Sequence, residues 1–131
     1  MNKIVVRNPK TILPVGSWYS KDEEELICNK LFVVVFILWE LNKARDKIKC
    51  LKNHPIHEYT RYLWDVASGG MMQVGMLEFY AQEIQEVADD FKRSRNAWVK
   101  ERTSTALKVM NEIIYGDYSI DTSIYTDPNR E

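Results

Sequence analysis

An unbroken run of nine apolar residues, Leu31 to Trp39, lies in the first third of the chain. On both sides of this run, apolar residues recur at spacings of three and four, which is the period of an α-helix. The sequence SKDE at 20–23 is typical of a helix start, because Ser20 can cap the free N–H groups while Glu23 reaches back to it. The pattern therefore predicts a long helix over about 20–50. One apolar face follows its whole length: Ile27, Leu31, Val34, Leu38, Leu41 and Ile48.

A buried β-strand is the competing interpretation of the apolar run, because Val33, Val34 and Val35 are β-branched and favour extended backbone. The charged flanks favour the helix instead. Acidic residues at 22–25 would lie at the positive end of the helix dipole, and basic residues at 43–49 would lie at its negative end.

Two further apolar faces surround the middle of this predicted helix. Phe32, Phe36 and Trp39 form one of them, and Val33 and Ile37 belong to the other. A helix that is apolar on every side is normally covered on every side, so we place it at the centre of the fold. Most of the four tryptophans and seven tyrosines are expected to belong to the core. The remaining helices are short, and we therefore expect a homodimer or higher oligomer to cover the rest.

The rest of the chain predicts two or three more helices. Pro55 suits the first turn of a short amphipathic helix that the sequence SGG at 68–70 ends. A single helix over 71–115 would be roughly 68 Å long. Such a helix would project as an arm, or the segment breaks at RSRN, 93–96, where Ser94 or Asn96 could start a new helix.

The two ends of the chain carry a different pattern. Residues 1–19 are predicted to be extended or irregular, and 117–131 to be a short strand or a disordered tail. The alternation around 120–124 would allow this tail to pair with the sequence KIVV at 3–6. The fold class that follows is mostly α: one helical domain over 1–131, a three- or four-helix bundle around the helix at 20–50, with minor strand pairing of the termini possible.

Composition adds few constraints to this picture. Apolar residues make up 45% of the 131 residues and charged residues 28%, which is typical of a soluble globular domain. The apolar run is half as long as a membrane-spanning helix requires, and no signal peptide is recognisable, so we expect a cytoplasmic protein with no membrane contact. Both cysteines are expected to be reduced, because a helix would hold Cys28 and Cys50 too far apart for a disulfide.

Three carboxylates are the best candidate for a metal site. Glu83, Glu86 and Asp90 share one helical face, and carboxylates so placed can hold Mg²⁺. The sequence EVAD at 86–89 fits an ExxD motif, and in this it resembles the all-α nucleotide pyrophosphohydrolases of the MazG type. That resemblance implies Mg²⁺-dependent nucleotide hydrolysis. The EExxE motif that completes the family pattern is not matched at 23–28, and a solvated helix face is the alternative interpretation.

A basic stretch at 91–102 is the second candidate site. It combines cations that can neutralise phosphates with a tryptophan that can stack on a base, and the same residues could instead contact a protein. Its members are Lys92, Arg93, Arg95, Trp98, Lys100 and Arg102. The net charge of the whole chain is −1, so any preference for nucleic acid must come from this local patch.

No motif for a nucleophile elbow, a P-loop or a dinucleotide fold occurs in the sequence, and we expect neither an enzyme nor a cofactor. His54 and His57, which flank Pro55, are interpreted as residues of a helix start rather than metal ligands. The preferred function is an interaction or regulatory protein that binds another protein, an inhibitor or adaptor of the kind that phages and mobile elements encode. The alternatives are nucleic-acid binding through 91–102 and Mg²⁺-dependent nucleotide hydrolysis.

Overall fold

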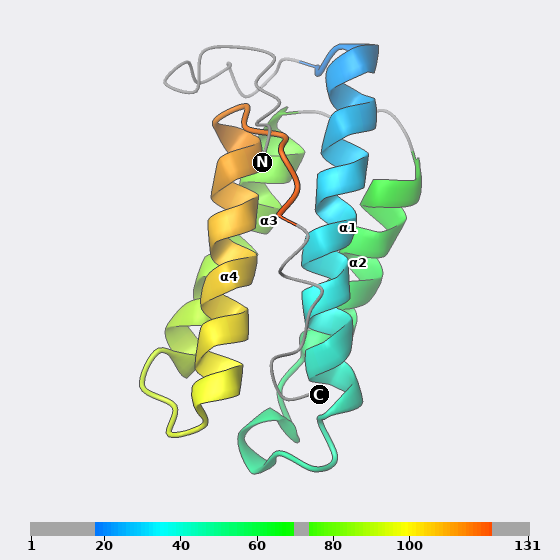
Figure 1. Ribbon diagram of the computed structural model, residues 1–131. Coiled ribbons are helices and arrows are strands. Elements are labelled where there is room, and N and C mark those ends of the chain that lie inside the picture. The colour runs from blue at the N-terminus through cyan, green and yellow to red at the C-terminus, as the bar shows by residue number, and fades with distance from the viewer. Residues whose placement is uncertain (1–17, 70–73, 122–131) are drawn as a thin grey trace.

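Four α-helices and one short 3-10 helix form the described part of the protein, which in this computed structural model comprises residues 18–69 and 74–121. These elements are α1 (Lys21–Lys43), η1 (Lys49–Leu51), α2 (Ile56–Gly69), α3 (Val74–Phe91) and α4 (Ala97–Ile114). Figure 1 shows the four α-helices side by side, with α1 and α4 in front, α2 behind α1 and α3 behind α4. The prediction of a mostly helical bundle with a long helix is confirmed.

The first helix begins where the sequence predicted and ends earlier. The hydroxyl of Ser20 accepts a hydrogen bond from the backbone N–H of Glu23 at 3.2 Å, which is the expected cap. The helix ends at Lys43 rather than near residue 49. The apolar stripe fails at Arg45, so no buried side chain holds the next turn, and Ile48 adopts extended backbone that leads into η1.

The core is built around α1, which packs against both α2 and α4, while α3 packs against α4. Every α1 member of the predicted apolar stripe is fully buried. Within one chain α1 is not covered on every side, and the oligomer expected to cover the remaining face stays a prediction. Trp39 is 47% exposed, and Phe32 and Phe36 are only partly buried, because α2 and α4 leave this side of α1 open.

The predicted break in the segment 71–115 is confirmed, and a single projecting helix is ruled out. Helix α3 ends at Phe91 and α4 begins at Ala97. The side chain of Asn96 caps α4 by accepting a hydrogen bond from the backbone N–H of Val99 at 3.1 Å.

The segment after α4 turns back between α4 and α1, as Figure 1 shows in orange and red. Gly116 allows this reversal, because its φ of 85° lies in the left-handed region that other residues avoid. Within 117–121 no strand forms. The proposed pairing with residues 3–6 lies outside the described residues, as do residues 1–17 and 122–131.

A buried polar network fixes this segment against α1. The ammonium of Lys30, which is only 2% exposed, donates a hydrogen bond to the carbonyl of Asp117 at 2.7 Å and lies 3.1 Å from the carboxylate of Glu112. Nearby, the Tyr118 hydroxyl donates to Glu23 at 2.8 Å. A buried charge is tolerated only when such partners compensate for lost water, so the network couples the end of α4 to α1.

Across residues 18–69 and 74–121, none of the helices combines the length and apolar character needed to cross a lipid bilayer.

Candidate functional site

A groove between α1 and α2, here called the aromatic groove, is lined mainly by apolar and aromatic side chains. It encloses about 540 Å³. Its lining residues come from the middle of both helices: Phe32, Val35, Phe36, Trp39, Asn42, His57, Thr60, Arg61 and Trp64. Because α1 and α2 each place these residues on one face at helical spacing, the groove runs along the two helices.

Large aromatic rings on the groove are both exposed and held in place. Trp64 is 53% exposed, and its ring packs edge-on against Phe32 with 5.4 Å between the ring centroids. The ammonium of Lys43 lies 4.3 Å from the centre of the Trp39 ring, a favourable cation–π contact. The expectation that most of the tryptophans and tyrosines belong to the core is wrong for the tryptophans, since Trp18 is also more than half exposed.

The polar groups of the groove are few, and none of the lining side chains is a carboxylate. Arg61 supplies a cation from α2. The Asn42 side-chain oxygen is buried and has no hydrogen-bond partner among the described residues. The groove can therefore bind an apolar group and offer one buried acceptor beside it.

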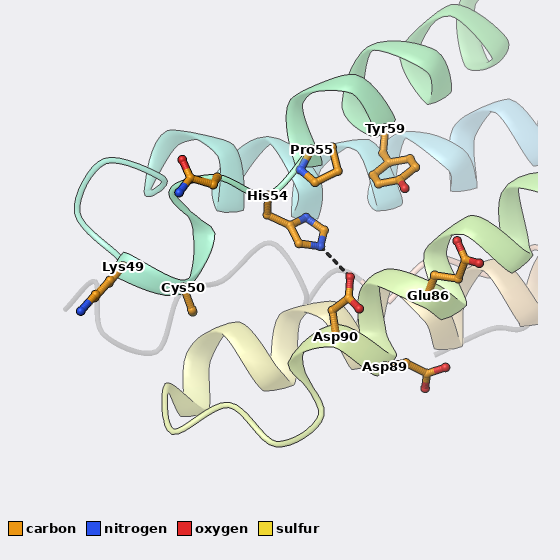
Figure 2. A pocket seen from close by; sticks show the side chains of 9 residues that line it. Lys49, Cys50, His54, Pro55, Tyr59, Glu86, Asp89 and Asp90 are labelled. Atoms are coloured by element: carbon orange, nitrogen blue, oxygen red, sulfur yellow. Dashed lines mark hydrogen bonds and ion pairs between the residues drawn. The ribbon is translucent and has the colours of Figure 1, made fainter.

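A second hollow, shown in Figure 2, lies between the α1–α2 connection and α3 and encloses about 590 Å³. We call it the His54 hollow. The His54 Nε2 lies 2.9 Å from a carboxylate oxygen of Asp90, and its ring packs on Phe91 at a centroid distance of 4.7 Å. These contacts tie the connection to α3. Its lining residues are Lys49, Cys50, Asn53, His54, Pro55, Tyr59, Glu86, Asp89 and Asp90.

Two of the three predicted metal ligands, Glu86 and Asp90, line the His54 hollow. The third, Glu83, is also on α3 and lies beside Tyr59 of α2. Among the residues that the structure describes, no three Asp, Glu, His or Cys side chains are grouped so that they could hold a metal ion. His57 lines the aromatic groove rather than this hollow, so the two histidines do not share a site. The Mg²⁺ site stays a prediction.

The hollow does not bring a nucleophile to a base. The Cys50 sulfur lies 3.9 Å from the Ser94 hydroxyl. In Figure 2 the Cys50 side chain points away from the His54 ring. A cysteine nucleophile needs its base within hydrogen-bond reach, and this geometry does not supply one.

Burial and the acidic side chains of α3 raise the pKa of Tyr59, which lines this hollow. Burial raises the pKa of Tyr59, and the carboxylate of Glu83, through its charge and a hydrogen bond, raises it further. A tyrosine whose pKa is higher in the folded chain than in the unfolded chain contributes stability as long as it stays protonated. This contribution is fully present below the pKa of the unfolded chain, which is about 10, and is lost as the pH rises through the pKa of the folded chain. We expect Tyr59→Phe to flatten the fall in stability as the pH rises above about 10, measured by urea unfolding. Tyr115→Phe, which removes an exposed phenol outside the hollow, is the control; equal pH profiles for the two variants would contradict a role for Tyr59.

The predicted basic site is only partly available at the surface. Lys92, Arg93, Arg95 and Lys100 are exposed, whereas Trp98 is half-buried against the core and Arg102 is buried. The first three of these cations lie in or beside the turn between α3 and α4.

The fold brings a second group of cations to the same end of the bundle. Lys47, Lys49 and Lys52 are exposed in the connection between α1 and α2. The contact of Cys50 with Ser94 holds that connection against the α3–α4 turn, and Figure 1 shows both loops at one end of the bundle. We call this surface the basic end. The sequence did not predict that the two groups of cations lie together. Contacts between the two segments span 44 residues, as for Cys50 and Ser94, and only the packing of the helices brings them to one end of the bundle.

Comparison with protein-family models, with curated proteins and with solved structures found no match to this chain.

Proposed function

We propose that this protein is a non-enzymatic interaction protein that binds another protein through the aromatic groove. The observation that carries the proposal is the pair of half-exposed tryptophans, Trp39 and Trp64, on facing helices. Tryptophan, tyrosine and arginine dominate the energetics of protein interfaces, and the groove presents Arg61 beside both tryptophans. An exposed apolar patch of this kind commonly marks a binding surface.

The preformed geometry of the groove supports the same proposal. The edge-on contact of Trp64 with Phe32 and the contact of Lys43 with Trp39 restrict rings that would otherwise lose rotamer freedom on binding. Restricting them in advance lowers the cost of association. A groove formed by two packed helices also suits an amphipathic helix of a partner, whose apolar face would lie along it.

We expect Trp64→Ala to weaken partner binding at least tenfold, roughly 1.4 kcal/mol, because the ring is an exposed anchor. The partner would be captured from the native host and the affinity of the purified pair measured by calorimetry. Phe79→Ala is the matched control, because Phe79 is an exposed aromatic on α3 outside the groove. Equal losses of affinity for both variants, or none for either, would contradict a role for the groove.

The finer role that we propose is that of an inhibitor or adaptor acting in the cytoplasm, of the kind that phages and mobile elements encode. Its support is a binding surface that needs no catalytic group. Blocking or bridging a partner requires a shaped surface and nothing more.

Nucleic-acid binding is a second candidate function, because the basic end joins two groups of exposed cations that the sequence keeps apart. Cations that neutralise phosphates make affinity fall steeply with salt. If this candidate is correct, replacing Arg93 and Lys49 together by alanine will weaken a gel shift and reduce the salt slope by about one per lost phosphate contact. Lys108→Ala, exposed on α4, is the control. A shift that both variants leave intact would contradict it.

A further inference from the structure

The open face of α1 has a charge pattern that is complementary to itself. Glu25 and Lys43 are exposed near opposite ends of the helix. They are 18 residues apart (43 − 25), which is roughly five full turns, so they project from the same side of α1. Phe32, Phe36 and Trp39 lie between them on that side. We call these five residues the α1 stripe.

Four of the five stripe residues form pairs that are symmetric about its centre, whereas Trp39 has no aromatic counterpart because position 29 is asparagine. Residue 34 is midway between Glu25 and Lys43, and Phe32 and Phe36 lie two residues to either side of it. A second α1 helix that runs in the opposite direction across this centre would place each Glu25 opposite a Lys43. The phenylalanines of the two copies would meet at the middle. A two-fold axis requires such a self-complementary surface.

We infer that the aromatic groove binds a second copy of this chain, with the two α1 helices antiparallel about a two-fold axis near residue 34. The inference rests on the proposed use of the groove for protein binding and names its partner. It covers Trp39 and Trp64, which the monomer leaves half-exposed, and it places an acidic residue at the rim of a groove whose own lining has none.

The charges distinguish this arrangement from the alternatives. In a parallel pair Glu25 would face Glu25 and Lys43 would face Lys43, and like charges in contact oppose association. Burying the apolar centre of the stripe supplies affinity, while the two outer ion pairs set the direction of the helices.

The first experiment measures mass by light scattering at micromolar concentrations. We expect a dimer for the natural chain and a monomer for the double variant Trp39→Ala and Trp64→Ala, whose helicity should be unchanged by circular dichroism. Phe79→Ala, outside the groove, should stay dimeric. A monomeric natural chain, or a dimer that the double tryptophan variant retains, would overturn the inference.

The second experiment exchanges the charges. Glu25→Lys alone places lysines opposite lysines at both ends of the interface, and Lys43→Glu alone places glutamates opposite glutamates. Each should raise the dissociation constant of the dimer roughly tenfold or more. The double exchange should restore it to within about threefold of the natural value. Single variants that leave the constant unchanged, or a double variant that adds their losses, would overturn the antiparallel arrangement.

The outcomes also separate this inference from the proposed function. A monomeric chain whose groove variants lose an unrelated captured protein would leave the proposed function standing and remove the second copy. A dimer with the expected charge behaviour, whose groove variants retain every captured protein, would support the second copy and remove the unrelated partner from the groove.

Discussion

Leu38→Ala should lower the free energy of unfolding by about 2–5 kcal/mol, the cost of emptying a fully enclosed leucine site. Leu38 has no exposed surface, and it lies on the α1 face that packs into the bundle. Rigid helices on both sides of α1 limit how far the site can collapse, so a cavity adds to the lost burial of the side chain. Urea unfolding followed by circular dichroism measures the difference.

Asn29→Ala provides the matched control for this experiment. Asn29 lies on the same helix and is exposed, so its replacement should change stability by less than about 0.5 kcal/mol. If both variants unfolded at the same urea concentration, α1 would not be the centre of the core.

Lys30→Ala should destabilise the fold by about 3 kcal/mol, the usual cost of removing one member of a buried ion pair. The ammonium of Lys30 joins Glu112 to the backbone carbonyl of Asp117. Without it, the carbonyl loses a charge-assisted hydrogen bond in a place that water reaches poorly, and the stem of the side chain leaves a gap. Chemical unfolding of the purified variant would measure the loss.

Two further variants separate the charge of Lys30 from its packing. Lys30→Met keeps most of the buried stem and removes the ammonium, so it should still cost roughly 1–3 kcal/mol. Lys108→Ala removes an exposed lysine from α4 and should be close to neutral. A Lys30→Met protein as stable as the natural chain would mean that the polar network contributes nothing to stability.

The parts of the fold that could be predicted from the sequence are those that depend on local features. The stripe of apolar residues, the cap at Ser20 and the break near Asn96 depend on side chains within a few turns of one another, and each is present in the structure. The end of α1 was placed too late because basic residues beyond Lys43 suit a helix end wherever it falls. The buried apolar face of α1 is interrupted at Arg45, and this interruption indicates that the helix ends near Lys43.

The aromatic groove could not be predicted because it depends on which faces of α1 the other helices cover. Trp39 and Val34 are both apolar residues near the centre of one helix, yet Val34 is fully buried and Trp39 is not. The same limit applies to the basic stretch: Arg102 has the charge of its neighbours but is 7% exposed. Hydrophobic period identifies a helix, while burial around its girth depends on tertiary packing.

The bond between Lys30 and Asp117 spans 87 residues of sequence, and this has a consequence for biosynthesis. At ordinary translation speeds, Asp117 follows Lys30 out of the ribosome by roughly 4–17 s. During most of this interval the apolar run at 31–39 lacks α4, one of the helices that pack against α1. Exposed apolar segments of this kind bind chaperones or aggregate. Expression at lower temperature prolongs that interval, so added chaperone should improve the yield of folded protein more than slower synthesis does.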